Sequence, residues 1–236
     1  MMDFDILATD YDGTLARHAV VDDTTIAALE RLRAAGKRRL LVTGRELHEL
    51  AQIFPRFDLF DIIVGENGAL LYEPSSQKIK LLCEPASREF ADMLRARGVT
   101  PLFIGRAIVA TQEPNEGVVA EIIETLKLPL EIILNKGSVM ALPRGVNKAS
   151  GLRAVLRENG WTAERTIAIG DAENDHDLLA AAGFGVAVSN AVPELKARAD
   201  LVTGASHGAG VAELIDLWLG GRLTRREITP DLPRVR

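Results

Sequence analysis

The strongest constraint on the fold is a regular alternation of short apolar runs with amphipathic stretches. An apolar run covers residues 5–9, the spacing of Ile26, Leu29 and Leu32 predicts a helix over 24–35, and a second apolar run covers 39–43. Short apolar runs bounded by turn residues are typical of buried strands. Strands that alternate with helices are joined by right-handed crossovers, so we expect a parallel sheet with helices on both faces.

The order of elements changes in the middle of the chain. Further strands are predicted at 62–64, 166–169, 186–188 and 201–202, and further helices at 147–159 and 209–219. Between these two groups the pattern predicts a helix over 87–97, a strand pair over 102–111, a helix over 115–126 and a strand pair over 130–142. The sequence therefore predicts an α/β protein, with a Rossmann-like parallel-sheet core interrupted by a small α+β unit. The expected divisions are residues 1–81 and 144–220 for the core, 82–143 for the inserted segment, and 221–236 for a polar tail.

Composition excludes several classes of function. A net charge of −5 provides no general positive field, so we expect neither a nucleic acid nor a membrane surface as partner. Cys83 is the single cysteine of the chain, and no apolar run reaches the 18 or so residues that span a membrane. We expect a cytoplasmic monomer or homodimer whose partner is a small molecule. The Gly-rich segment 204–210 lacks dinucleotide spacing, so it and His207 are interpreted as a solvated loop.

Two carboxylates follow the first predicted strand directly. Asp10 and Asp12 are two residues apart, and residues two apart in a strand face the same side. Both acids can therefore act on one cation or one reacting group at the edge where open α/β sheets bind ligands. Because Asp12-Gly13-Thr14 is also a common turn sequence, this segment by itself fits either a turn or a site.

Polar clusters also follow two other predicted strands, and this favours a site. Thr43-Gly44-Arg45 follows the second strand, and the segment 170–175 follows a later one. A hydroxyl group and backbone amides at a helix start suit phosphate oxygens. Asp10 and Asp171 supply the oxygen ligands that magnesium prefers. Lys148 begins a predicted helix, where the helix dipole disfavours a cation, so an external anion better explains its position. Taken alone, it would be interpreted as a solvated surface residue.

These segments together resemble the haloacid dehalogenase superfamily, and within it the Cof-type sugar-phosphatase branch of subfamily IIB. The first motif is matched by the segment 10–14, the second by Thr43 with Gly44 and Arg45, and the third by Lys148. The fourth is matched by Gly170-Asp171 with Asn174-Asp175. The resemblance covers nearly the whole chain, from Asp3 to about Trp218.

The resemblance implies a magnesium-dependent phosphomonoester hydrolase that works through a phosphoaspartate. It makes Asp10 the nucleophile and Asp12 the acid that protonates the leaving oxygen and then activates water. It places magnesium on Asp10, the backbone carbonyl of Asp12, and Asp171, with Asp175 orienting Lys148 and completing the metal site. The residues that it implies for binding the phosphoryl group are Thr43, Gly44, Arg45, Lys148 and Asn174. An ordinary Asp has a pKa near 3.9, so the sequence argument expects Asp10 to be ionised at neutral pH.

The resemblance also implies that the inserted segment is a cap that selects the leaving group. This segment is short for the branch and resembles the small caps of phosphoglycolate-type and sucrose-phosphatase-like members. Arg106 and Lys136 lie near predicted turns and are candidates for reading the substrate, although a solvated turn charge fits either one. The segment 66–69 follows the third strand and is expected to frame the mouth of the site.

Other functions remain open at this stage. A phosphomutase of the same superfamily would keep all the motifs but protect the phosphoaspartate from water. A phosphoacceptor signalling module also combines acids, a threonine and a lysine, but it needs only about 120 residues and no insertion. A haloacid dehalogenase would need neither Asp12 nor Asp171, and a silent binding protein would not need the full set of reactive residues. We expect a sugar phosphate or a phosphoglycolate-like acid as the substrate.

Overall fold

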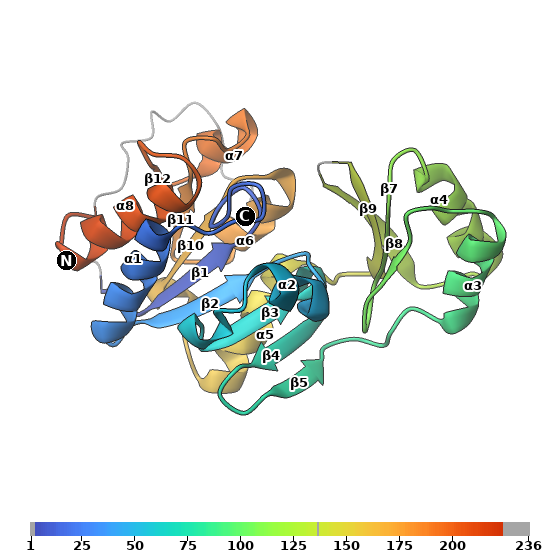
Figure 1. Cartoon of the computed structure of the whole chain (residues 1–236), viewed down its shortest axis with the longest axis horizontal. Coiled ribbons are helices and arrows are strands. Elements are labelled where there is room, and N and C mark those ends of the chain that lie inside the picture. The colour runs from blue at the N-terminus through green and yellow to red at the C-terminus, as the bar shows by residue number, and fades with distance from the viewer. Residues whose placement is uncertain (1–2, 136, 224–236) are drawn as a thin grey trace.

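A computed structural model describes residues 3–135 and 137–223 of the chain. Its larger sheet has eight strands in the order β12-β11-β10-β1-β2-β3-β4-β5 (Figure 1). Six of them pair in parallel: β1 (Ile6–Asp10), β2 (Arg38–Val42), β3 (Ile62–Gly65), β10 (Thr166–Gly170), β11 (Phe184–Ala187) and β12 (Leu201–Val202). The predicted α/β fold with a parallel-sheet core is confirmed.

The other two strands of this sheet form an antiparallel hairpin that the sequence analysis missed. β4 (Leu70–Glu73) pairs with β3, and β5 (Lys78–Leu81) forms the exposed edge. The strand β5 alternates lysines with apolar residues and is exposed at every position, so it lacks the continuous apolar run by which a buried strand is recognised. The core sheet is therefore mixed, with parallel strands at its centre.

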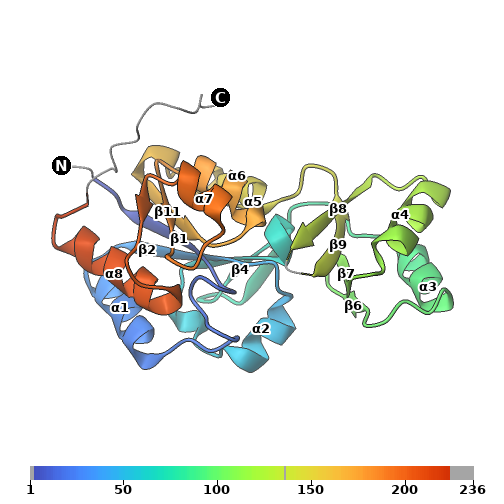
Figure 2. The same ribbon diagram turned by 90° about the horizontal axis from the view of Figure 1, so that it is seen from above.

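Helices cover both faces of the larger sheet. Figure 2 shows α1 (Asp23–Ala34) and α8 (His207–Leu219) on one face, and α5 (Lys148–Asn159), α6 (His176–Ala180) and α7 (Pro193–Arg198) on the other. A further short helix, α2 (Leu47–Ile53), follows β2. The Asp22 side chain caps α1 by accepting a hydrogen bond of 2.7 Å from the Thr25 N–H. Short 3-10 turns complete this part of the chain: η1 (Phe57–Leu59), η2 (Glu66–Gly68), η3 (Ala163–Arg165) and η4 (Glu173–Asp175).

The start of α8 corrects the interpretation of segment 204–210 as a solvated loop. The helix begins at His207, which is half-buried, two residues before the predicted start at 209. The Asn190 side chain accepts a hydrogen bond of 2.8 Å from the His207 N–H and so satisfies one of the free amides at the helix start. This cap comes from a residue 17 positions away, which local sequence patterns do not reveal.

The inserted segment contains the second sheet, with strands in the order β6-β7-β9-β8. Its strands β6 (Phe103–Ile104), β7 (Val109–Gln112), β8 (Leu130–Asn135) and β9 (Ser138–Pro143) pair antiparallel, and α3 (Arg88–Ala96) and α4 (Glu116–Thr125) cover the face away from the larger sheet (Figures 1 and 2). In β9, Val139 and Ala141 pack under these helices. Met140 and Leu142 pack in a second cluster with Ala69, which directly precedes β4 of the larger sheet. Both faces of β9 are therefore buried, in the alternation that a strand imposes.

No helix in the described part of the chain is long and apolar enough to cross a membrane. The division into domains at residues 81, 143 and 220 stays a prediction. Lys136 and nearly all of the predicted tail lie outside the described residues.

Candidate active site

The reactive residues predicted from the sequence meet at one edge of the larger sheet. β1 pairs with β2 on one side and with β10 on the other, all in parallel, with Asp10 opposite Val42 and Thr9 opposite Ile169. The chain leaves each strand at this edge, so the segments after β1, β2 and β10 converge there. Asp10, Thr43 and Asp171 each stand at or directly after one of these strand ends. All three are almost fully buried.

Lys148 lies between two buried carboxylates. Its Nζ is 2.6 Å from Asp10 Oδ1 and 2.6 Å from Asp175 Oδ1. Asp175 also accepts hydrogen bonds at its other oxygen from the N–H groups of Asp171, at 2.9 Å, and Ala172, at 3.1 Å. Both oxygens of Asp175 are thus occupied, and this carboxylate holds Lys148 directed towards Asp10.

Burial changes the acid–base properties of this pair. Desolvation raises the pKa of the Asp10 carboxyl to about 7, although Lys148 acts to lower it. Desolvation acts to lower the pKa of Lys148, but Asp10 and Asp175 outweigh it and raise this pKa above its usual value. Burial thus raises the pKa of Asp10 above the ordinary value used in the sequence analysis, because periodicity carries no information on how far this side chain is buried.

Three buried acids lie close together at this site. Carboxylate oxygens of Asp10, Asp171 and Asp175 lie within 4.8 Å of one another, and all three residues are buried. Lys148 is the one buried lysine beside them in the described chain, so three carboxylates face one ammonium group. Oxygen ligands at this spacing fit magnesium, and excess buried negative charge is costly unless a cation neutralises it. Asp10 and Asp171 are the better ligands, because both Asp175 oxygens already accept hydrogen bonds.

Asp12 and Arg45 form a pair that the sequence analysis did not predict. Arg45 Nε is 2.6 Å from Asp12 Oδ2, and Nη2 is 2.8 Å from Asp12 Oδ1, which is a two-point ion pair. Arg45 was expected to bind the phosphoryl group, but here its guanidinium binds Asp12 and Glu49. The Asp12 side chain does not belong to the acidic cluster, and metal binding through its backbone carbonyl stays a prediction.

The remaining predicted residues line the same edge. Thr43 is buried, and its hydroxyl accepts a hydrogen bond of 3.1 Å from the Arg45 N–H. The amide nitrogen and oxygen of Asn174 are buried, and neither has a partner among the described residues. A buried amide without partners suits a polar ligand, because the desolvation of its two polar atoms is otherwise uncompensated. Roles in binding substrate stay predictions for Thr43, Gly44 and Asn174.

The inserted segment covers this edge. A Cβ placed on Gly44 would lie 3.6 Å from the Met140 sulfur, so β9 packs directly over the loop after β2. On the other side, β8 approaches η4, the turn that carries Asn174. Figure 1 shows the second sheet beside the ends of β1 and β2. The candidate site therefore lies at the end of the larger sheet that faces the second sheet.

Sequence reasoning assigned no role to two supporting residues. The Thr14 hydroxyl donates a 3.2 Å hydrogen bond to Asp171 Oδ1, across 157 positions of sequence. Asn190 donates a 2.8 Å hydrogen bond to the Gly13 carbonyl and so joins the loop after β1 to the start of α8. Thr14 could have been found as part of the first motif, whereas nothing local marks Asn190.

Comparison with known sequences identifies relatives along most of the chain. A family profile described as haloacid dehalogenase-like hydrolase matches residues 7–125 and 103–215. A phosphoglycolate phosphatase of Methanothermobacter thermautotrophicus is 31% identical over 227 residues, which cover 91% of this chain and 98% of the relative. A phosphoglycolate phosphatase of Metallosphaera sedula is 32% identical over 236 residues, with 91% and 98% covered.

Solved structures agree with the fold. A haloacid dehalogenase-like hydrolase from Bacteroides thetaiotaomicron has a TM-score of 0.76 and 22% identity, with 91% of this chain and 99% of that chain covered. A sugar phosphatase of haloacid dehalogenase subclass IIB has a TM-score of 0.72 and 21% identity, with 92% and 99% covered. Both likenesses extend over the parallel sheet and the inserted segment.

Proposed function

The chain belongs to the haloacid dehalogenase-like hydrolase family, and from this premise we propose that it is a magnesium-dependent phosphatase of small phosphorylated metabolites. The observation that carries the proposal is the cluster of three buried carboxylates, two of which contact Lys148 at 2.6 Å. The relatives named phosphoglycolate phosphatase support the reaction class. The substrate is a phosphoglycolate-like acid or a sugar phosphate.

In the proposed reaction Asp10 is the nucleophile. A carboxylate oxygen of Asp10 attacks phosphorus, the bond from phosphorus to the leaving oxygen breaks, and a phosphoaspartate forms. Lys148 donates to Asp10 at 2.6 Å and so holds positive charge beside the reacting carboxylate. Asp175 keeps the ammonium group in place through its own 2.6 Å contact. Magnesium, when bound by Asp10 and Asp171, supplies positive charge that stabilises the oxygens of the transferring phosphoryl group.

In this proposal Asp12 is the general acid of the first step and the general base of the second. It donates a proton to the leaving oxygen in the first step, and in the second step it accepts a proton from the water that attacks the phosphoaspartate. Water then releases inorganic phosphate and restores Asp10. Protonated Asp12 cannot keep the two-point pair with Arg45 that the structure shows. The cycle therefore requires Arg45 to release one oxygen of Asp12 when substrate enters.

Asn174 and Thr43 hold the phosphoryl group in this proposal. The amide of Asn174 has no partner among the described residues, and Thr43 presents its hydroxyl at the same edge. Transfer of a phosphoryl group depends mainly on positioning and charge, because its transition state is largely dissociative. We also propose a cytoplasmic location, which the presence of a single cysteine supports.

The test is release of inorganic phosphate from phosphoglycolate, a panel of sugar phosphates and an aryl phosphate, each with magnesium and with excess chelator. We expect release that requires magnesium. A folded protein that releases no phosphate from any of them would contradict the proposal. A trapped phosphoaspartate would then favour the phosphomutase or the phosphoacceptor module.

A further inference from the structure

The turn η2 lies where three parts of the molecule meet. The Glu66 N–H donates to the Arg45 carbonyl at 3.0 Å, and the Asn67 N–H donates to the Thr43 carbonyl at 2.9 Å. On another side, a Cβ placed on Gly68 would lie 2.0 Å from the Asn147 carbonyl oxygen, at the start of α5. The turn is thereby hydrogen-bonded to the loop after β2 and packed closely against the start of the helix that carries Lys148.

The backbone of this turn has an unusual conformation. Glu66, Asn67 and Gly68 have φ values of 49°, 56° and 105°, all in the left-handed region. Residues with side chains seldom adopt this region, and Glu66 has no local feature that favours it. Such strain persists where the surrounding contacts impose it, and it concentrates at functional sites. The contacts of the turn therefore fix the direction of the Glu66 side chain.

The Glu66 side chain reaches into the inserted segment. It is fully buried, and its carboxylate accepts hydrogen bonds from the N–H groups of Arg106 at 2.8 Å, Ala107 at 2.8 Å and Ile108 at 3.1 Å. A Cβ placed on Gly105 would lie 2.6 Å from Glu66 Oε2, so a side chain at this position would push the Glu66 carboxylate aside. Hydrogen bonds to an ionised acceptor are stronger than those between neutral groups. The Glu66 carboxylate thus holds the loop between β6 and β7 through three of its backbone N–H groups.

Arg106 is the charged residue on this fixed loop. Its side chain is exposed, and no described side chain forms an ion pair with it. Its N–H is bound to Glu66, the Glu66 N–H is bound to the Arg45 carbonyl, and the Arg45 guanidinium is bound to Asp12. Two residues thus connect the loop of Arg106 to the proposed acid of the reaction.

We propose that Glu66 is a positioning residue that holds the loop 105–108 over the site so that Arg106 binds a carboxylate on the leaving group. The inference rests on the proposed function and narrows the substrate to phosphorylated acids. A guanidinium matches a carboxylate with two parallel hydrogen bonds, whereas sugar hydroxyls do not offer this geometry. Since the loop is attached by its backbone, the Arg106 side chain stays available to the ligand.

The first test compares two substrates that differ only in the charged group. Phosphoglycolate and ethyl phosphate have leaving groups of two carbons, and only the first carries a carboxylate. In Arg106→Ala we expect the ratio of kcat/KM for phosphoglycolate to that for ethyl phosphate to fall about tenfold or more, mainly through KM, because a charged hydrogen bond is lost. Arg106→Lys should give an intermediate ratio. An unchanged ratio in Arg106→Ala would overturn the proposal.

The second test addresses Glu66. Glu66→Gln keeps the shape of the side chain but replaces one accepting oxygen with an NH₂ group, so the loop loses hydrogen bonds and the same ratio should fall. The control is Glu213→Gln, because Glu213 also accepts from two backbone N–H groups, Gly204 at 2.9 Å and Ala205 at 2.8 Å, and it lies on α8, outside the inserted segment. The control should keep the wild-type ratio. A wild-type ratio in Glu66→Gln, or an equal fall in both variants, would contradict a positioning role.

Two further outcomes are informative. If Glu66→Gln does not fold, Gly105→Ala gives the same test, because its added Cβ would displace the Glu66 carboxylate from the loop. If the folded wild-type protein releases phosphate from no compound of the full panel, the proposed function itself fails. If it releases phosphate only from sugar phosphates, the proposed function stands and the present inference fails. If it hydrolyses both and Arg106→Ala leaves the ratio unchanged, only the present inference fails.

Discussion

At each end of the parallel strands of the larger sheet an aspartate pairs with an arginine, and the two pairs have different surroundings. At the edge where β1 ends, Asp12 pairs with Arg45 at 2.6 Å, beside three buried carboxylates and one lysine. At the opposite edge, where β2 and β3 begin, Asp61 pairs with Arg39 at 3.0 Å. Arg39 also donates from Nε to the Leu59 carbonyl at 2.8 Å. Its guanidinium therefore has both a carboxylate partner and a backbone acceptor.

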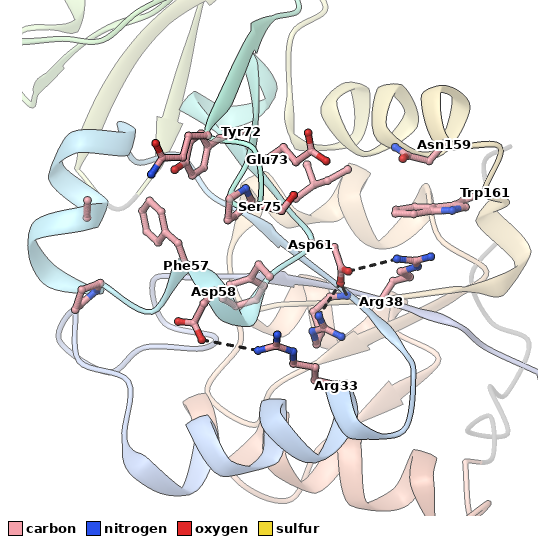
Figure 3. Close-up of a pocket in the computed structure, with 17 residues that line it drawn as sticks. Arg33, Arg38, Phe57, Asp58, Asp61, Tyr72, Glu73, Ser75, Asn159 and Trp161 are labelled. Carbon is pink, nitrogen blue, oxygen red and sulfur yellow. Dashed lines mark hydrogen bonds and ion pairs between the residues drawn. The ribbon is translucent and has the colours of Figure 1, made fainter.

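The opposite edge also has an open hollow. Figure 3 shows a groove of about 680 Å³ whose lining includes Arg33, Arg38 and Trp161, with Arg38 paired to Asp61 and Arg33 to Asp58. The Arg38 guanidinium lies 5.2 Å from the centre of the Trp161 ring. Every charge named here has a protein partner. We therefore base the proposed site on the clustered buried carboxylates and on the unpaired buried amide of Asn174, not on the volume of this hollow.

The largest expected effect is at Asp10. In Asp10→Asn we expect phosphate release to fall about 10⁴-fold or more, because an amide does not attack phosphorus. Asparagine can still accept from Lys148, so the thermal unfolding temperature should stay close to that of the wild type. Both are measured on one preparation, as phosphate release and as the melting curve. Near-normal turnover by the variant would remove the basis for treating this edge as the active one.

A smaller loss is expected for Asp12→Asn. An amide cannot donate the proton to the leaving oxygen in the way a carboxylic acid does, so kcat should fall roughly 10²- to 10³-fold, as is usual for general acid–base catalysis. The measurement is kcat with a substrate whose leaving group is a poor alkoxide, and then with an activated aryl phosphate. The loss should be greater with the poor leaving group. Equal losses with both substrates would argue against an acid role.

Thr14 tests the support of the acidic cluster. In Thr14→Val the hydroxyl that donates to Asp171 is lost while the shape is kept, so the magnesium concentration for half-maximal activity should rise about tenfold. Thr25→Val is the matched control, since Thr25 is also buried but its hydroxyl has no partner in the described chain. A magnesium titration of both variants separates the two cases. Equal shifts would mean that any buried threonine matters in this way.

The smallest effect on activity is expected at the opposite edge. Asp61→Asn weakens the pair with Arg39, so the free energy of unfolding should fall by about 1–2 kcal/mol, as for a partly exposed hydrogen-bonded charge. The value of kcat/KM should stay within about twofold of wild type, because Asp61 and Arg39 pair with each other at the end of the sheet opposite the proposed site. Urea unfolding and the phosphate assay check the two halves. A large loss of activity without a loss of stability would break the contrast between the edges.

The sequence by itself determined the α/β core, the inserted α+β segment and the place of the reactive residues. The alternation of apolar runs is local, and parallel strands bring their carboxyl ends to one edge, so Asp10, Thr43 and Asp171 could be placed together without coordinates. The hairpin β4–β5 was missed because its edge strand has no buried run.

Only the tertiary structure decided which charges meet. Arg45 pairs with Asp12 across 33 positions, Glu66 binds the N–H of Arg106 across 40, and Lys148 contacts Asp10 across 138. Burial, which raises the pKa of Asp10 to about 7, likewise arises from packing. Periodicity reports which side of an element is apolar, but the partner of a charge depends on how distant elements pack against one another.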